Sequence, residues 1–124
     1  MRRKLAPRAS CPYCPRVPTL LEKIEASAAQ RLRLPPGRTP AQELARYKNF
    51  LKVESHRLKI LHRAGGGGRE ICQARSAIID ALLKNLYETV CRLGNFYTPK
   101  LPSLALLAIG GYGRGELNPH SDID

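Results

Sequence analysis

The chain has 124 residues, which is enough for one small domain. Of these, 43% are hydrophobic, near the lower edge of the range that is usual for globular proteins. The 21 Lys and Arg outnumber the 10 Asp and Glu, and the formal net charge of +11 favours acidic partners such as nucleic acid, anionic lipid or nucleotide phosphates. No apolar run reaches the roughly 18 residues of a membrane-spanning helix, and the basic N-terminus lacks the apolar segment of a secretory signal. We therefore expect a cytoplasmic protein with no membrane partner.

Residues 1–38 are basic and rich in proline, and we expect this segment to be weakly ordered. One helix is predicted inside it, over about residues 19–34, because apolar residues recur there at steps of three or four. These apolar residues are Leu20, Leu21, Ile24, Ala28 and Leu32. Pro35-Pro36-Gly37 then ends the helical pattern.

The chain contains four cysteines. Cys11 and Cys14 have the spacing of a zinc knuckle or a redox pair, but one pair supplies only two metal ligands. The prolines around them also disfavour the strand and helix that flank a redox site. We interpret both as ordinary reduced cysteines of a flexible tail, and we interpret Cys72 and Cys91 as small buried apolar residues.

Residues 39–94 are predicted to form a hairpin of two helices. Thr39 offers an N-cap hydroxyl, Pro40 suits the first helical position, and Gln42 occupies the capping-box position. One apolar stripe follows at steps of three, four or seven, and Glu54 interrupts it, which predicts partial packing. The stripe consists of Leu44, Tyr47, Leu51, Leu58 and Leu61. His56 and His62 have no ligand partners at suitable spacing, so we expect them at the surface.

The second helix is predicted over about residues 69–93, after a linker formed by the glycines 65–68. This linker is not a phosphate-binding loop, because no Gly-Lys-Ser/Thr follows it and no strand precedes it. A broad apolar face indicates that the helix is properly buried. The face consists of Ile71, Ile78, Ile79, Leu82, Leu83, Leu86 and Val90. Asp80 lies at its margin, where a local salt bridge is the expected role.

Residues 101–124 carry the features that indicate chemistry. Residues 103–109 form a short apolar run, and the proline before it and the glycines after it favour a buried strand over a helix. Gly110 and Gly111 would let phosphate groups approach the backbone. A second strand is expected to begin near Ser121. The expected fold class is therefore mixed α/β, with a helical hairpin followed by the first strand, a glycine loop and the start of a second strand.

Asp122 and Asp124 are separated by one residue. In an extended chain both carboxylates would project to the same side, while Ile123 would turn into a core. Carboxylate oxygens suit Mg²⁺, which could hold the phosphates of a nucleotide against Gly110 and Gly111. Each piece is weak alone, but the order of strand, glycine pair, ten intervening residues and Asp-Ile-Asp predicts a nucleotide site.

Gly110-Gly111 followed by Asp122-Ile123-Asp124 resembles the signature of the polymerase β-like nucleotidyltransferase superfamily. The fuller string from Gly110 to Asp124 resembles the bacterial PII uridylyltransferase/uridylyl-removing family. The stretches Ala74-Arg75-Ser76 and Ile79-Asp80 resemble the helix that precedes the catalytic strand in that family. The resemblance covers about residues 45–124, and it identifies the chain as an N-terminal fragment of such an enzyme.

The resemblance implies transfer of UMP from UTP to a tyrosine of the PII signalling protein, with glutamine acting as an effector through domains that lie outside this chain. It implies that Gly110 and Gly111 hold the triphosphate and that Asp122 and Asp124 are catalytic metal ligands for Mg²⁺. Ser121 and Arg114 would contact phosphate, although Arg114 could equally pair with Glu116 or Asp80. The family's third carboxylate is absent from this chain, so we expect these 124 residues alone to be inactive.

Two other readings remain open from the sequence. Adenylyl transfer to another protein or to a small alcohol would use the same metal chemistry. A basic helical module that binds nucleic acid would account for the charge of +11. Aromatic residues are few, however, and no RNA- or DNA-binding motif is present, so nucleic acid is not the expected partner.

Overall fold

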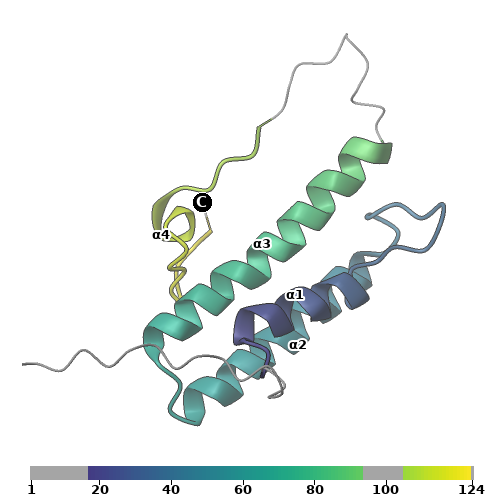
Figure 1. Cartoon of the computed structure of the whole chain (residues 1–124). Coiled ribbons are helices and arrows are strands. Elements are labelled where there is room, and N and C mark those ends of the chain that lie inside the picture. The colour runs from purple at the N-terminus through teal and green to yellow at the C-terminus, as the bar shows by residue number, and fades with distance from the viewer. Residues whose placement is uncertain (1–16, 94–104, 124) are drawn as a thin grey trace, which may run out of the picture.

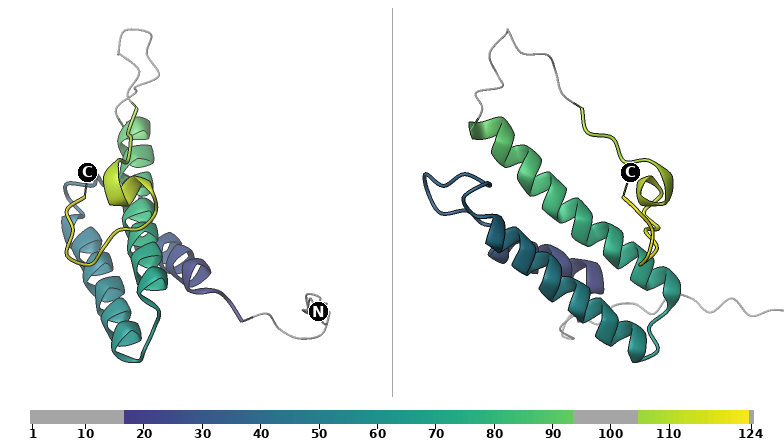
Figure 2. Two further views of the ribbon diagram at one scale, coloured as in Figure 1. Left: turned by 90° about the vertical axis from the view of Figure 1, so that its left-hand side faces the viewer. Right: turned by 180° about the vertical axis from the view of Figure 1, so that it is seen from behind.

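The structure is a computed structural model, and it describes residues 17–93 and 105–123. Its long helices are α1 (Leu20–Arg31), α2 (Leu44–Arg63) and α3 (Gly68–Leu93), and a single helical turn, α4 (Gly110–Gly113), follows. Helices α2 and α3 form the predicted antiparallel hairpin, and α1 packs against both of them (Figure 1). The C-terminal segment lies along α3 on the side away from α1 (Figure 2).

The core lies among the three long helices. Phe50 of α2 and Ala74 of α3 are both fully buried. The other buried apolar members of this core are Ile24, Ala28, Leu32, Tyr47, Leu58, Ile71, Ile78 and Leu82. The apolar stripes predicted burial correctly for most of these positions. Leu44 and Val90 were expected to be buried but are 53% and 45% exposed, and the stripes did not include Phe50.

Helix α1 is better packed than its proline-rich surroundings predicted. Thr19 caps it with a full capping box, in which Thr19 Oγ1 accepts from the Glu22 amide at 3.2 Å and the Thr19 amide donates to the Glu22 carboxylate at 2.7 Å. Ile24 is only 2% exposed and Leu32 only 1%. Residues 1–16, including Cys11 and Cys14, lie outside the described residues, so the predictions for them and for the domain divisions stay predictions.

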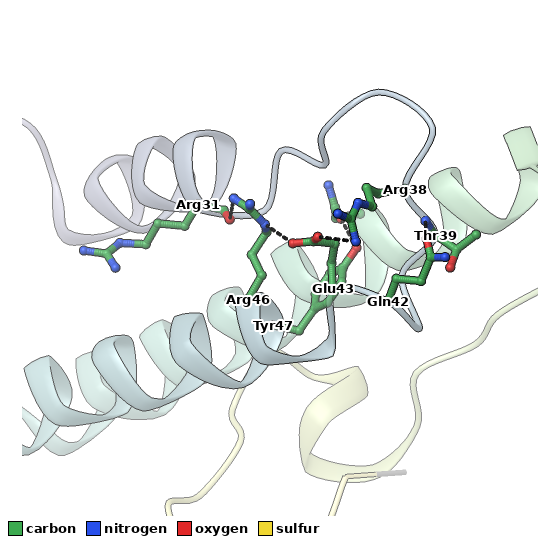
Figure 3. Close-up of polar contacts among 8 residues, drawn as sticks. Arg31, Arg38, Thr39, Gln42, Glu43, Arg46 and Tyr47 are labelled. Atoms are coloured by element: carbon green, nitrogen blue, oxygen red, sulfur yellow. Dashed lines mark hydrogen bonds and ion pairs between the residues drawn. The ribbon is translucent and has the colours of Figure 1, made fainter.

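Helix α2 begins later than predicted. The Thr39 amide donates to Gln42 Oε1 at 3.0 Å, which is half of the expected capping box, but residues 40–43 form turns and the helix starts at Leu44. Glu43 stabilises this entry, because it accepts from Arg46 Nε at 3.2 Å and lies 4.0 Å from Arg38 (Figure 3). Arg46 also donates to the carbonyl of Arg31 at 3.5 Å, so the same contacts tie α1 to α2.

The glycines 65–67 form the turn of the hairpin, as predicted, and the fourth glycine of the run, Gly68, already begins α3. Gly65 has φ +88°, a backbone conformation that residues with a Cβ rarely adopt. A Cβ on Gly66 would lie 2.9 Å from the carbonyl oxygen of Leu61, so this glycine also allows a close approach of the chain to the end of α2. His56 and His62 are exposed, as expected.

Glu54 is a buried acid in the core region of α2, with only 2% of its surface exposed. Its Oε1 accepts from Ser27 Oγ of α1 at 2.6 Å and from Arg57 at 2.9 Å. A buried carboxylate is tolerated when its oxygens are paired in this way. Glu54 therefore does not weaken the stripe as the sequence suggested, but joins α1 to α2.

We expect Ser27→Ala to lower the free energy of unfolding by about 1–2 kcal/mol, because Glu54 would lose a hydrogen bond inside the protein. Urea unfolding followed by circular dichroism would measure this. Ser55→Ala, at an exposed position of α2, is the matched control and should change stability little. An equal effect of the two substitutions would contradict the role given to the Ser27–Glu54 bond.

The mixed α/β prediction was wrong for the described residues. Residues 105–109 and 121–123 form no strand, and the described part of the chain is helical without a sheet. A strand is stable only when a neighbouring strand pairs its backbone groups, and no such neighbour lies among the described residues. The apolar side chains of the expected strands are accordingly exposed. These are Leu106 (61%), Leu107 (79%), Ile109 (63%) and Ile123 (46%).

Candidate functional site

The glycine-rich loop, residues 110–121, contains a single helical turn rather than an open bend. The chain is extended at Ile109 and then forms α4, in which the Gly113 amide donates to the carbonyl of Ile109 at 2.8 Å. Gly110 has φ +62° and Gly115 has φ +70°, so both positions favour glycine. The Glu116 amide closes the loop on the carbonyl of Gly111 at 2.9 Å. Several of the loop's glycines therefore have structural reasons that are independent of any ligand.

Tyr112 attaches the start of this loop to α3. Its ring is buried, with 7% exposed, and its hydroxyl donates to Asp80 Oδ1 at 2.6 Å. Burial, followed by this hydrogen bond and the negative charge of Asp80, raises the pKa of Tyr112 far above the ordinary tyrosine value. Sequence reasoning gave Tyr112 no role and gave Asp80 a salt bridge. The single aromatic residue among the glycines was the signal that could have indicated this contact.

Ser76 and Arg75 of α3 hold the middle and the end of the loop. Ser76 Oγ accepts from the amide of Leu117 at 3.0 Å and donates to the carbonyl of Cys72 at 3.1 Å. Leu117 itself is fully buried. Arg75 donates to the carbonyl oxygens of Asn118 and Ser121, the latter at 3.4 Å. The glycine-rich loop is thus attached to one helix at several points along its length.

The chain turns at residues 118–121 and then runs back toward α4 (Figures 1 and 2). The Ser121 amide donates to the carbonyl of Asn118 at 3.1 Å, and the Ser121 hydroxyl donates to the same oxygen at 2.9 Å. In this structure the Ser121 hydroxyl therefore stabilises the turn that comes directly before Asp122. Its predicted contact with phosphate stays a prediction.

The structure does not assemble all the predicted site residues. Asp122 and Arg114 are exposed, and no ion pair of either is found within residues 17–93 and 105–123. Glu116 pairs with Arg69 at 3.6 Å rather than with Arg114. Asp124 lies outside the described residues, so the alignment of the two carboxylates stays a prediction. Ile123 is 46% exposed and does not turn into a core.

The described residues supply an incomplete set of metal ligands. No cluster of three or more His, Cys, Asp or Glu side chains suited to a metal occurs in the part of the chain that the structure describes. Asp122 is an exposed carboxylate beside an ordered turn, which is the type of oxygen ligand that Mg²⁺ uses. Asp122 thus fits Mg²⁺ as one ligand of several.

A cleft of about 670 Å³ lies between α2, α3 and the turn at residues 118–121. Leu58, Ile71 and Cys72 contribute an apolar floor, and Lys59 and Arg75 contribute positive charge. His62 and His120 also line the cleft, and no acidic side chain does so among the described residues. These charges favour an anion near the turn that comes before Asp122.

Cys72 and Cys91 are free cysteines that are half-buried, whereas the sequence predicted buried ones. No described helix is both long and apolar enough to cross a membrane.

We expect Tyr112→Phe to lower the free energy of unfolding by about 1 kcal/mol at about pH 7, because the bond to Asp80 is lost. The raised pKa of Tyr112 means that its neutral hydroxyl stabilises the fold fully below the unfolded-state value of 10.0, and this stabilisation is lost as the pH rises above that value. The stability difference between wild type and Tyr112→Phe should therefore shrink at about pH 11. Urea unfolding at the two pH values measures it, and an unchanged difference would contradict the assignment.

Known proteins that share one name are similar to this chain. The chain is 36% identical over 84 residues to the "Bifunctional uridylyltransferase/uridylyl-removing enzyme" of Pseudomonas putida, a match that covers 68% of this chain and 9% of the relative. It is 32% identical over 107 residues to the protein of that name from Stutzerimonas stutzeri, which covers 86% of this chain and 10% of the relative. It is 39% identical over 82 residues to the protein of that name from Vibrio atlanticus, a match that covers 66% of this chain and 9% of the relative. No family model and no solved structure matches the chain.

By their names these relatives are nucleotidyltransferases, the class that the resemblance of Gly110-Gly111 and Asp122-Ile123-Asp124 implied. More narrowly, the chain is a homologue of one segment of the bifunctional uridylyltransferase/uridylyl-removing enzymes, which confirms the resemblance seen in the sequence. It spans about a tenth of the length of these curated relatives.

Proposed function

We propose that this chain is part of a uridylyltransferase that transfers UMP from UTP to a protein acceptor and releases pyrophosphate. The observation that carries the proposal is the 32–39% identity to proteins named uridylyltransferase/uridylyl-removing enzyme. The glycine-rich loop supports it, because its glycines let the phosphates of a nucleotide approach the backbone. The acceptor is the tyrosine hydroxyl of a PII-type signalling protein, with glutamine as an effector that acts through other domains.

Each residue of the site has a proposed role. Gly110 and Gly111 let the triphosphate approach the backbone, and Arg114, which is exposed beside them, contacts its charge. Asp122 would hold Mg²⁺ together with Asp124. When bound, the metal ion would neutralise phosphate charge and orient the triphosphate. The attachment of the loop to α3 supports these roles, because a pre-formed loop loses less conformational entropy when a nucleotide binds.

Calorimetric titration of the chain with UTP, with and without Mg²⁺, tests the nucleotide part of this proposal. We expect Mg²⁺-dependent binding of UTP that is stronger than binding of ATP. Stronger binding of ATP would favour an adenylyltransferase. Binding of single-stranded or duplex nucleic acid that weakens steeply with salt, without any binding of UTP, would favour the nucleic-acid-binding module instead.

A chimeric enzyme tests the transfer itself. In it, the matching segment of the Pseudomonas putida relative is replaced by the corresponding residues of this chain. We expect the folded chimera to transfer UMP from radiolabelled UTP to a PII-type protein. A folded chimera that binds the acceptor but transfers nothing would contradict the proposal.

A further inference from the structure

Three neighbouring side chains of α3, Arg75, Ser76 and Asp80, contact the glycine-rich loop at successive points. Ser76 and Asp80 are four residues apart, so they lie one turn apart on the same face of the helix. Their partners, Leu117 and Tyr112, are both buried. The loop's middle and beginning are therefore held by side chains whose loss would leave buried groups without partners.

Arg75 differs from the other two because it holds the end of the loop. Its guanidinium donates to the carbonyl oxygens of Asn118 and Ser121, which are the first and last residues of the turn. A planar guanidinium has several donors in a fixed arrangement, so it can bridge two carbonyl groups where an ammonium group cannot hold both equally well. Asp122 follows this turn directly.

We infer that Arg75 is a positioning residue, which fixes the turn at residues 118–121 and thereby sets the place of Asp122 relative to the glycine-rich loop. This inference rests on the proposed function and deepens it. Helix α3 acts as the rigid element on which the phosphate-binding end and the metal-binding end of the loop are held in register. Arg75 itself contacts neither metal nor nucleotide in this role.

Arg75→Ala and Arg75→Lys test the inference in the chain itself. Amide hydrogen exchange of Ser121, whose N–H donates to Asn118, reports whether the turn is held. Titration with Mg²⁺ and UTP reports the site. We expect Arg75→Ala to speed exchange at Ser121 and to weaken Mg²⁺-dependent UTP binding about tenfold, with Arg75→Lys giving a smaller effect.

Arg92→Ala is the matched control, because Arg92 Nε donates to the carbonyl of Glu88 within α3 and makes no contact with the glycine-rich loop in the described part of the chain. It should leave exchange at Ser121 and UTP binding unchanged. Weaker UTP binding in Arg75→Ala with unchanged exchange would overturn the inference, since Arg75 would then contact the ligand directly. Unchanged exchange and unchanged binding would overturn it as well. If the wild-type chain binds no UTP, the exchange of Ser121 alone decides whether Arg75 holds the turn, and the chimeric enzyme decides the proposed function.

Discussion

Gly113→Ala should displace the glycine-rich loop and abolish most of the nucleotide affinity of the chain. A Cβ added at Gly113 would lie 2.5 Å from the carbonyl oxygen of Ala108 and 2.9 Å from its carbonyl carbon. Both are backbone atoms, so no side chain can rotate away to relieve the contact. The conflict falls next to Tyr112, whose bond to Asp80 attaches the loop to α3. We expect the free energy of unfolding to fall by about 1–3 kcal/mol.

Other glycines of the chain provide graded controls. A Cβ on Gly111 would lie 3.4 Å from the carbonyl oxygen of Glu116, an ordinary contact, and one on Gly67 would meet nothing within 4 Å. Gly111→Ala and Gly67→Ala should therefore leave the fold nearly unchanged. Gly115 has room for a Cβ but has φ +70°, so Gly115→Ala should cost about 1–2 kcal/mol through backbone strain alone. This series separates steric conflict from strain.

The readouts for Gly113→Ala are urea unfolding, hydrogen exchange at Leu117 and titration with Mg²⁺ and UTP. We expect faster exchange at Leu117, because the loop must move off Ser76 to make room. Exchange at Leu117 equal to that in Gly111→Ala would show that the loop tolerates the extra methyl group. It would also contradict the view that α4 must lie close to Ala108.

Sequence periodicity predicted the helices because burial of one face determines them. Apolar residues at helical spacing, such as Tyr47 in α2 and Ile78 in α3, predicted the two helices of the hairpin. The run of glycines between the two patterns predicted the turn. The capping box at Thr19 was not foreseen, although Glu22 stands at its usual position. Phe50 was missed because it lies beside the stripe that was traced through Tyr47 and Leu51. It belongs to the core that α2 and α3 share with α1, a helix that the sequence placed in a weakly ordered segment.

The strand prediction failed for a different physical reason. An apolar run such as residues 105–109 records what the side chains prefer, but a strand also requires a partner for its backbone groups. The sequence predicted which residues could form the candidate site, but it did not predict the contacts that hold them in place. The contacts of Asp80 with Tyr112, Ser76 with Leu117, and Arg75 with the turn join positions 32, 41 and more than 40 residues apart. No local pattern in a single sequence indicates such pairs.

Asp122→Asn should lower the Mg²⁺-dependent affinity for UTP at least about 100-fold, and it should abolish transfer in the chimeric enzyme. An amide keeps the shape of the carboxylate but loses the negative charge that a hard divalent cation requires. Changes in groups that merely orient metal ligands cost 10–100-fold, so loss of a ligand should cost at least as much. Asp124→Asn should act in the same direction. Titration of each variant with UTP at several Mg²⁺ concentrations measures this effect.

Stability should not change, because Asp122 is exposed and its side chain holds no described part of the fold together. Glu116→Gln is the matched control, since it removes one negative charge from the same loop and, within residues 17–93 and 105–123, breaks one exposed pair with Arg69 at 3.6 Å. If Glu116→Gln weakened UTP binding as much as Asp122→Asn does, the effect would arise from the loop's overall charge. If Asp122→Asn kept wild-type affinity and transfer, Asp122 would be no metal ligand, and the glycine-rich loop would have to bind the nucleotide without it.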